Sequence, residues 1–470
     1  MDSRRSTGGR GAAPESGQRP GVAGPMSAAD TIVAAATPPG SGGVGVVRIS
    51  GPAAADIARS MLGFLPEPRR AAYAVFRDPA GGAIDRGIAL YFPAPASFTG
   101  ESVLELQGHG GPVVVAALVD AAVGLGARNA EPGEFTQRAF INDKLDLAQA
   151  EAIADLVASG TRQAARAALR SLEGAFSDDV NALAEQVTTL RVYVEAAIDF
   201  PEEEVDFLAD AELLQRIERC EAGFAELLDK AASGRVLRDG YRVVIVGRPN
   251  AGKSSLLNRL SGEETAIVTA VAGTTRDVIR ERIDIDGLAV ELVDTAGLRE
   301  DPDVIEAEGI RRARAALQQA DAVLWLQDAT TTVAAGPEEP LPDGVALTIV
   351  RNKIDLCGEA PGIEAGEPVV VRLSAKTGAG IEGLRRHLRE LAGYRDLGEG
   401  AYTARRRHVD ALRRAAAHFS AGRDALEHKR AGELLAEELR LAQDALGDIT
   451  GRTTPDDLLG RIFADFCIGK

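Results

Sequence analysis

The sequence has few cysteines and no long apolar run. Three of its 470 residues are cysteines, and Cys220, Cys357 and Cys467 lie far apart without the paired spacing of metal ligands, so neither a disulfide framework nor a structural zinc site is indicated. No stretch of about 18 apolar residues occurs, and the first residues lack the apolar core of a signal peptide. We therefore expect a cytoplasmic protein without a membrane span.

Positive charge is also scarce. The chain has 53 Lys and Arg against 70 Asp and Glu, a formal net charge of −17. This balance argues against broad binding to a phosphate backbone, because such binding favours a basic surface. Any contact with RNA must be local or depend on a partner. With 45% hydrophobic residues, the chain is long enough for about three domains with cores of their own.

What the sequence does contain is a phosphate-binding loop. Residues 247–255 read GRPNAGKSS and follow the apolar run 243–246, a pattern typical of a strand that leads into a GxxxxGK[ST] loop. In such a loop backbone NH groups surround the β-phosphate, Lys253 reaches the β- and γ-oxygens, and Ser254 ligates Mg²⁺. The sequence therefore predicts a nucleoside triphosphate site.

Three short motifs, DTAG, NKID and SAK, follow in the order that GTPases require. We expect the Asp355 carboxylate to accept two hydrogen bonds from guanine N1 and N2, each contributing about 1.5–3 kcal/mol, whereas adenine offers no donor at N1. Asn352 is expected to bond either guanine O6 or the phosphate loop, and the Ala375 amide to meet O6. The predicted nucleotide is GTP.

The chemistry of hydrolysis is less evident from the sequence. Ras-like enzymes place a water-orienting glutamine where Leu298 stands here, and no arginine finger is identifiable. A monovalent cation would supply the missing charge, bound by a side-chain oxygen of Asn250 and backbone carbonyls of residues 269–275. Thr275 would complete the Mg²⁺ ligation when GTP orders that segment. The alternative that Asn250 is only a turn residue stays open.

The fold class predicted is a multidomain protein with α/β and all-α parts. Residues 1–27 are rich in Gly, Pro, Ser and Arg and are predicted to be a disordered extension. An α/β domain is predicted for 28–143. Helical periodicity covers 144–237 and 397–470, so the nucleotide-binding block 238–396 is predicted to be inserted between two halves of one helical domain.

Several residues near the ends of these predicted segments give further predictions. The extension results either from a start placed before Met26 or from a transit peptide, which its prolines and acids disfavour. Asn142 or Asp143 is predicted to cap the first long helix. Gly234 and Gly240 are predicted to break the helix that precedes the nucleotide-binding block.

Four local patterns give further predictions. The GxGxxG match ending at Gly45 runs into a strand, so it predicts a turn between strands and not a dinucleotide site. Asp286 and Gly287 separate two alternating runs and predict a hairpin. Trp325 is predicted to be buried in a strand. The arginine cluster 405–407 is predicted to lie on a solvated helix face.

The sequence also contains several longer motifs: GRPNAGKSS, TAVAGTTRDV, DTAGLRE, FCIGK, DTIVAAATPPGSGGVGVVRISG, SFTGESVLELQGHGGPV, GEFTQRAFINDKLDLAQAEAI and IDFPEEEVDF. Together they resemble the MnmE family of tRNA-modification GTPases, also called TrmE. The resemblance covers nearly everything after Met26. It implies an N-terminal domain that binds tetrahydrofolate and dimerises, and a helical domain with an inserted Ras-like GTPase domain.

The resemblance also implies a reaction and partners. Members of the family act with the FAD-dependent MnmG, also called GidA, in an implied heterotetramer. Together they add a carboxymethylaminomethyl or aminomethyl group to C5 of the wobble uridine of certain tRNAs. The implied one-carbon donor is a tetrahydrofolate derivative, either 5-formyl- or 5,10-methylene-tetrahydrofolate.

Matching the family's motifs to this sequence also implies which residues bind the metal ions and GTP. K⁺ is implied at the Asn250 side chain and at carbonyls near Thr269, Val271 and Thr274. Mg²⁺ is implied at Ser254 and Thr275. In full, the residues expected to contact GTP are Asn250, Ala251, Gly252, Lys253, Ser254, Ser255, Thr269, Ala270, Val271, Ala272, Gly273, Thr274, Thr275, Asp294, Thr295, Ala296, Gly297, Asn352, Lys353, Ile354, Asp355, Ser374, Ala375 and Lys376.

The family's switch glutamate falls on Glu306, whose carboxylate would orient the attacking water through a second water; Glu308 is the rival position. Cys467 is either a nucleophile near the folate or a buried apolar residue. Folate contacts are implied at Arg48, Glu105, Lys144 and Lys470. Taken alone, Arg48 and Glu105 equally suit a structural ion pair.

Two other functions stay open. A ribosome-assembly or stress-regulatory GTPase would act as a binding switch, but such proteins usually add an RNA-binding module or a second GTPase domain, and neither is found in the sequence. The second is a folate-binding aminomethyltransferase with a regulatory GTPase domain and a different acceptor, which folate binding would not distinguish from tRNA modification. Only the identity of the acceptor separates that function from tRNA modification.

Overall fold

The computed structural model describes residues 30–199, 211–262, 280–294, 317–331, 341–342, 345–393, 400–452, 459–460, 462–463, 466 and 469. The chain divides into two compact units. The first ends at Glu131 and includes Gly469, and the second begins at Pro132. Both α/β and all-α parts are present, which confirms the predicted fold class.

The first unit is a six-stranded sheet with the strand order β3-β4-β5-β2-β1-β6. Its strands are β1 (Ile32–Ala35), β2 (Gly42–Ser50), β3 (Ala72–Arg77), β4 (Ala83–Phe92), β5 (Val103–Gly110) and β6 (Arg128–Asn129). In β2, Val47 and Ile49 are fully buried and Arg48 between them is not, because successive side chains of a strand point to opposite faces. Helices α1 (Ala54–Leu62) and α2 (Pro112–Gly124) pack against the buried face. Since β2 begins at Gly42, the GxGxxG match lies in a turn and a strand, as predicted.

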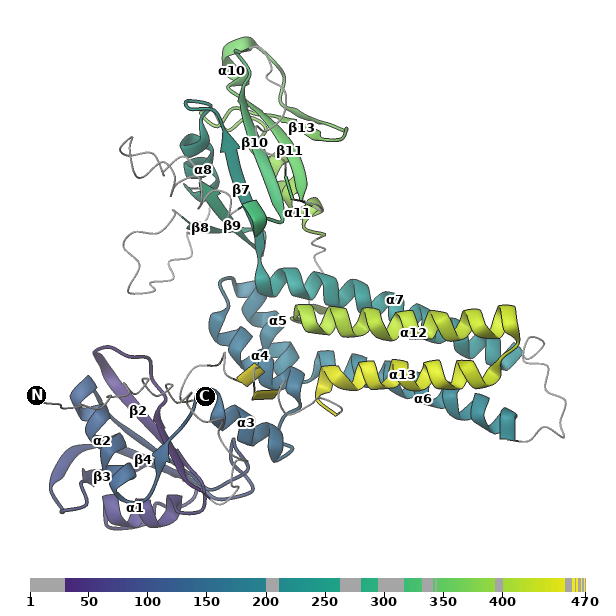
Figure 1. The fold of residues 1–470 in the computed structure, drawn as a ribbon. Coiled ribbons are helices and arrows are strands. Elements are labelled where there is room, and N and C mark those ends of the chain that lie inside the picture. Colours follow the sequence, from purple (N-terminus) through teal and green to yellow (C-terminus); the bar gives the residue numbers. More distant parts are fainter. Residues whose placement is uncertain are drawn as a thin grey trace, which may run out of the picture. The chain divides into compact units, whose positions relative to one another are not determined.

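The helical part of the second unit combines two distant stretches of sequence. Its helices are α3 (Glu134–Ile141), α4 (Leu147–Ala158), α5 (Arg162–Leu172), α6 (Ala175–Asp199), α7 (Ala211–Asp239), α12 (Arg406–Lys429) and α13 (Gly432–Thr450). One hydrophobic core joins the two stretches, with Phe176 and Phe224 from the first and Leu412 and Leu439 from the second. The long helices lie side by side (Figure 1).

Two boundary predictions in this part are wrong. The cap of α4 is Asp146, whose carboxylate accepts a hydrogen bond from the Gln149 backbone NH at 2.8 Å while the Gln149 side chain bonds back. Asn142 and Asp143 instead follow the end of α3. Gly234 does not break α7, because the helix continues through it to Asp239.

Gly234 has a packing role. A Cβ at this position would overlap the backbone carbonyl of Tyr402, so the glycine lets α7 approach the chain that enters α12. Gly240 does end the helix, as predicted, in the left-handed conformation with φ of +75°.

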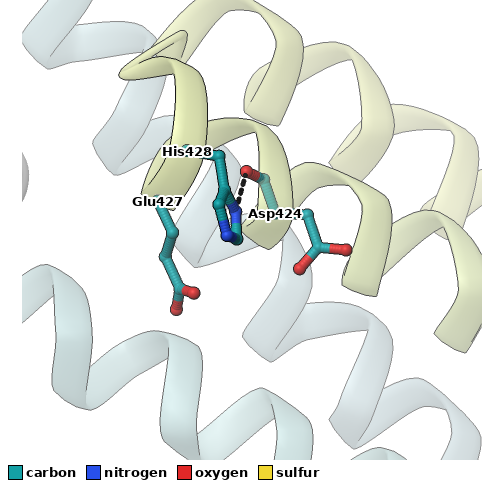
Figure 2. A group of neighbouring side chains, drawn as sticks. All are labelled: Asp424, Glu427 and His428. Carbon is teal, nitrogen blue, oxygen red and sulfur yellow. Dashed lines mark hydrogen bonds between the residues drawn. The ribbon is translucent and has the colours of Figure 1, made fainter.

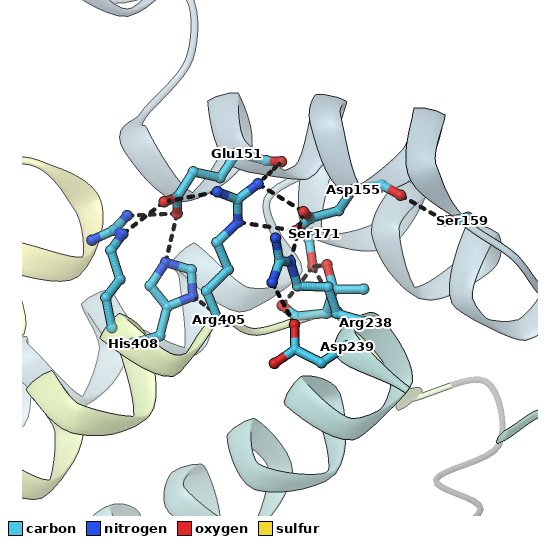
Figure 3. Close-up of polar contacts among 10 residues, drawn as sticks. Glu151, Asp155, Ser159, Ser171, Arg238, Asp239, Arg405 and His408 are labelled. Carbon is cyan, nitrogen blue, oxygen red and sulfur yellow. Dashed lines mark hydrogen bonds and ion pairs between the residues drawn. The ribbon is translucent and has the colours of Figure 1, made fainter. Parts of the chain in front are cut away.

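The prediction for the arginine cluster is also wrong. Arg406 lies on the solvated face, but Arg405 and Arg407 turn inward to the fully buried carboxylate of Glu151 on α4 (Figure 3). Arg407 makes two contacts of 2.6 and 2.7 Å with Glu151, and Arg405 reaches Asp155 at 2.7 Å. We call the group of Glu151, Asp155, Arg238, Arg405, Arg407 and His408 the helical joint.

His408 is the neutral member of the joint. Its Nε2 lies 2.8 Å from Glu151, and its Nδ1 accepts the backbone NH of Arg405 at 3.0 Å (Figure 3). An Nδ1 that accepts carries no proton, so His408 donates through Nε2. Burial lowers the pKa of His408, and the nearby Arg407 acts in the same direction. Burial alone would raise the pKa of Glu151, but His408 and Arg407 hold it far below the usual range.

The remaining part of the second unit is a seven-stranded sheet with the order β12-β13-β11-β10-β7-β9-β8. Its strands are β7 (Tyr241–Gly247), β8 (Arg280–Ile285), β9 (Leu288–Asp294), β10 (Ala322–Asp328), β11 (Ala346–Asn352), β12 (Gly362–Glu364) and β13 (Val369–Arg372). The five central strands are parallel, and the two edge strands are antiparallel to their neighbours. Helices α8 (Lys253–Gly262), α10 (Ile354–Cys357) and α11 (Ile381–Leu391) complete this part.

Two predictions for this sheet are confirmed. Strands β8 and β9 form the expected hairpin, with φ of 50° at Asp286 and 92° at Gly287, the positive pair that a tight two-residue hairpin turn needs. Trp325 is buried in β10. Because ligands of open α/β sheets bind beyond the carboxyl ends of parallel strands, the loops that follow β7, β10 and β11 are where a site is expected.

Candidate GTP-binding site

The phosphate loop connects the buried strand β7 to α8. Asn250 and Gly252 adopt positive φ values of 64° and 97°. A Cβ at Gly252 would overlap the side-chain amide of Asn352, so only glycine fits there. Ser254 and Ser255 lie exposed in the first turn of α8, where unpaired backbone NH groups and the helix dipole favour an anion.

Lys253 lies over this loop. Its ammonium donates to the carbonyl oxygens of Gly247 and Arg248 at 2.8 and 3.0 Å, and the residue is 7% exposed. Carbonyl oxygens are neutral acceptors, so these bonds are weaker than bonds to a charged phosphate oxygen. The lysine is therefore placed where a phosphate oxygen can replace these carbonyls as its hydrogen-bond acceptor.

Asn352 joins the loops of the nucleotide site. Its side-chain NH₂ donates to the Ala251 carbonyl at 2.9 Å, and its side-chain oxygen accepts the Ala375 backbone NH at 2.9 Å. Asn352 was expected to bond either guanine O6 or the phosphate loop, and in the structure it bonds the phosphate loop. The Ala375 amide is bonded to Asn352, and its contact with guanine O6 stays a prediction.

The SAK loop is held from two sides. Ser374 donates to one carboxylate oxygen of Asp355 at 2.6 Å and accepts the Thr377 backbone NH. Arg259 on α8 donates to the carbonyls of Ala375 and Lys376 at 3.2 and 2.7 Å. Asp355 itself is exposed, and its second oxygen has no bond to any residue that the structure describes. That oxygen is free for the guanine edge.

Asp328, at the end of β10, was missed by the sequence analysis. The Lys353 ammonium joins the Asn250 carbonyl at 2.7 Å to the Asp328 carboxylate at 2.6 Å. Hydrogen bonds from Lys353 and Thr330 lower the pKa of Asp328 to about 2. The available signal was the position of this acid at the end of a buried parallel strand next to β7.

Several predicted site residues lie outside the described part of the chain. Asp294 ends β9, where its backbone pairs with Ile245 of β7, which directs the chain toward the phosphate loop. Ile354 is buried at the start of α10. The predicted residues outside the described ranges are Thr269, Ala270, Val271, Ala272, Gly273, Thr274, Thr275, Thr295, Ala296, Gly297, Glu306, Cys467 and Lys470.

A second polar site lies in the first unit. Arg48 on β2 pairs with Glu105 on β5 at 2.9 Å, and one Arg48 nitrogen lies 3.4 Å from the Gly469 carbonyl. The ion pair predicted as an alternative is therefore present, and Gly469 lies beside it. Lys144, the other described residue of the predicted folate set, is exposed and belongs to the second unit.

One group of side chains elsewhere has the spacing of metal ligands. Asp424, Glu427 and His428 lie near the end of α12 (Figure 2). All three are exposed, and Glu427 is paired with Arg423 at 2.7 Å. A solvated carboxylate that already has a cationic partner is typical of a helix surface, so this group is not assigned a metal.

The phosphate loop, the strand order and the joined guanine-side loops define a GTP hydrolase of the P-loop class. Models of two protein families match the chain: the GTP-binding protein TrmE N-terminus at residues 31–144 and the MnmE helical domain at 147–467. The second covers more than half of the sequence.

Curated relatives extend this match over nearly the full length. The tRNA modification GTPase MnmE of Marinobacter nauticus is 57% identical over 453 residues, covering 94% of this chain and 99% of the relative. That of Erwinia tasmaniensis is 56% identical, covering 95% and 100%. The solved Aquifex aeolicus Era bound to GDP.AlF4- is 25% identical, covering 39% of this chain and 67% of Era with a TM-score of 0.26. The chain belongs to the MnmE family of tRNA modification GTPases. No helix in the described ranges is long and apolar enough to cross a membrane.

Proposed function

We propose that this chain is a K⁺-stimulated GTP hydrolase that modifies C5 of the wobble uridine of certain tRNAs. It acts with an FAD-dependent partner of the MnmG type and uses a tetrahydrofolate derivative as one-carbon donor. The observation that carries the proposal is the Asn352 bridge, because it joins the phosphate loop to the loop expected to read guanine. Family membership supplies tRNA as the substrate.

The conformation of the phosphate loop supports the proposed K⁺ site. Lys353 holds the Asn250 carbonyl, and Asn250 has left-handed backbone angles. In this proposal the Asn250 side chain and carbonyls near Thr269, Val271 and Thr274 hold K⁺, which supplies positive charge to the transferred phosphoryl group. Ser254 and Thr275 hold Mg²⁺, for which the exposed Ser254 hydroxyl in the first turn of α8 is suited. Glu306 orients the attacking water.

The polar site of the first unit supports folate binding. Arg48 and Glu105 are both partly exposed, at 22% and 16% of their side-chain surface. A guanidinium and a carboxylate side by side offer donors and acceptors to a pterin edge and a charge to a glutamate tail. Lys144, Lys470 and Cys467 complete the proposed set, with Cys467 as nucleophile.

The remaining parts of the proposal concern assembly and place. Tyr73 on β3 and Ile88 on β4 are paired across the strands and are 73% and 41% exposed. An exposed apolar pair on a sheet favours burial against a partner, and we propose a homodimer through the first unit. A heterotetramer with the MnmG-type partner and a cytoplasmic location complete the proposal, as do the domain limits 28–143, 144–237, 238–396 and 397–470.

A pair of substitutions at Asn250 tests the cation. Glycine adopts left-handed backbone angles freely, so Asn250→Gly retains the turn and removes the side chain together with its oxygen. GTP hydrolysis by the wild-type chain should be faster in KCl than in NaCl at equal ionic strength, and Asn250→Gly should lose this difference. Asn250→Asp, which retains an oxygen, is the matched control. If Asn250→Gly still responds to K⁺, Asn250 is a turn residue and the cation assignment is wrong.

Two further substitutions separate the other assignments. Glu306→Ala should slow hydrolysis and leave GTP affinity unchanged, and unchanged turnover would remove Glu306 from the mechanism. Arg48→Gln should weaken binding of 5-formyl-tetrahydrofolate, measured by calorimetry, without changing GTP hydrolysis. Equal folate affinity in Arg48→Gln and the wild type would contradict the folate assignment.

A further inference from the structure

Helix α5 carries a row of three arginines on one side. Arg162, Arg166 and Arg170 are four residues apart and lie on its outer side, while Ala164 and Ala168 face the core. Arg162 and Arg166 are exposed and Arg170 is half-buried. None of the three makes an ion pair or a hydrogen bond with any residue in the described ranges. We call these three residues the α5 arginine row.

Two other helices of this unit differ from α5 in their acidic neighbours. Exposed arginines on α13 and α12 have acids one turn away: Arg440 contacts Glu437 and Asp444, and Arg423 contacts Glu427. The α5 sequence RQAARAALRSL contains no acid at all. In a chain with a net charge of −17, this row is a local cationic surface.

The positions of these three arginines lower the stability of helix α5. Like charges four residues apart repel each other, and Arg162 lies in the first turn, where the helix dipole disfavours a cation. Thr161 caps this end, since its hydroxyl accepts the Ala164 backbone NH at 3.0 Å. The same positive potential that destabilises Arg162 attracts an anion. A bound polyanion removes both repulsions.

We propose that the α5 arginine row binds the phosphate backbone of tRNA. From Arg162 to Arg170 the row covers nine residues, about 12 Å along the helix axis, which spans several consecutive phosphates of one strand. Arginine is suited to phosphate oxygens because its planar guanidinium donates two parallel bonds. The inference rests on tRNA modification as the function and adds the surface through which an acidic protein meets an acidic substrate.

The salt dependence of tRNA binding tests the row. The variant carrying Arg162→Gln, Arg166→Gln and Arg170→Gln retains helix propensity, because Gln and Arg are similar in this respect. Each phosphate contact contributes about 0.7–0.9 to the slope of log K against log salt, so three contacts lower the slope by about 2–3. If the affinities are equal at 1 M salt, this difference in slope raises the Kd at 0.1 M salt by about 100-fold or more. Fluorescence anisotropy of labelled tRNA with the full chain gives both quantities.

The matched control removes three exposed arginines elsewhere: Arg59→Gln, Arg406→Gln and Arg413→Gln, whose side chains are 55%, 87% and 68% exposed. It has the same net charge, so an effect of overall charge appears in both variants. GTP hydrolysis without tRNA should be unchanged in both. If the triple variant fails to fold, Arg166→Gln alone should lower the slope by about 0.7.

The outcomes distinguish the inference from the function. Equal slopes for the triple variant, the control and the wild type overturn the inference and leave tRNA modification standing. Loss of binding to an acidic protein partner with unchanged tRNA affinity also overturns it and assigns the row to that partner. If wild-type cells and a Lys253→Ala strain have the same modified uridines, the failure lies in the proposed function itself.

Discussion

The nucleotide site and the helical joint use cationic side chains in opposite ways. In the joint, Arg407 and Arg405 meet the carboxylates of Glu151 and Asp155, both buried. In the nucleotide site, Lys253 meets the backbone carbonyls of Gly247 and Arg248. Buried charges paired with each other are fixed, since a change of partner would leave a charge uncompensated. A lysine bonded to neutral carbonyls exchanges them for phosphate at little cost.

The two regions should therefore respond differently to substitution. Changes in the joint should lower the free energy of unfolding, and changes in the nucleotide site should lower turnover without unfolding the chain. Arg238 extends the joint to the last turn of α7, where it contacts Asp155 at 2.9 Å just before β7 begins. The joint therefore also fixes the helix that leads into the nucleotide-binding sheet.

The largest expected effect is that of Glu151→Ala. It leaves Arg405, Arg407 and His408 facing a buried space without their carboxylate, and removal of one partner of a buried ion pair costs about 3–5 kcal/mol. Urea denaturation followed by circular dichroism should show this loss. Glu173→Ala, at an exposed position after α5, is the control and should change stability by less than about 0.5 kcal/mol. Equal midpoints for the two variants would break the comparison.

Lys253→Ala should produce the converse result. Loss of a preorganised cation at a charged transition state lowers turnover by about 10²–10³-fold. The fold should be retained, because the lost bonds end on loop carbonyls that water reaches once the side chain is gone. Steady-state GTP hydrolysis and the urea midpoint, measured on the same sample, check both halves. A loss of stability as large as that of Glu151→Ala would contradict the distinction.

Asn352→Ala lies between these two cases. It removes the bonds to Ala251 and Ala375 and leaves the buried Ala375 amide unsatisfied, which costs about 1–3 kcal/mol. We expect GTP affinity to fall by about 10- to 100-fold, because the phosphate and guanine loops are no longer held together. Nucleotide titration by calorimetry measures the change. Asn258→Ala, on the exposed side of α8, should bind GTP like the wild type.

A smaller effect is expected for Asp328→Asn. The Lys353 ammonium loses its anionic partner but retains the Asn250 carbonyl, so kcat/KM for GTP should fall by less than about tenfold, as for a partly exposed pair. Because the pKa of Asp328 is about 2, the carboxylate stays ionised throughout the range in which the enzyme is assayed. A change in the pH profile of kcat/KM above pH 5 would contradict this role.

The smallest effect is the pH dependence that His408 gives to stability. Its folded-state pKa is lowered from 6.5, so below that pH the unfolded chain takes up a proton that the native chain does not. Stability from this group is complete above pH 6.5 and declines as the pH falls toward the native pKa. Urea midpoints between pH 8 and 5.5 should fall less steeply for His408→Gln than for the wild type. Parallel curves would mean that the pKa of His408 is the same in the folded and unfolded chains.

The parts of the molecule that the sequence predicted share a local origin. The phosphate loop, the Asp286 and Gly287 hairpin and the buried strand at Trp325 all follow from patterns within about ten residues. The Arg405 and Arg407 contacts could not be predicted in this way, because Glu151 is more than 250 residues away in sequence. The sequence of an arginine cluster does not show whether its side chains contact water or a carboxylate from a distant segment.

One of the wrong predictions has a local signal in the sequence, and two other roles depend on contacts between distant segments. Asp146 and Gln149 form the capping box D-x-x-Q, a stronger signal than the isolated Asn142. Gly234 was interpreted from helix propensity, but close approach to Tyr402 decided its role. Asp328 gained its role only when the sheet placed β10 beside β7.

The central claim is that GTP turnover at this phosphate loop supports tRNA modification. The most direct test is to replace the wild-type gene with one encoding Lys253→Ala, digest total tRNA and quantify wobble-uridine nucleosides by mass spectrometry. With protein level unchanged, we predict loss of C5-aminomethyl-type uridines. An unaltered nucleoside profile together with a defect in ribosome assembly would contradict the claim and indicate a GTPase that acts as a binding switch.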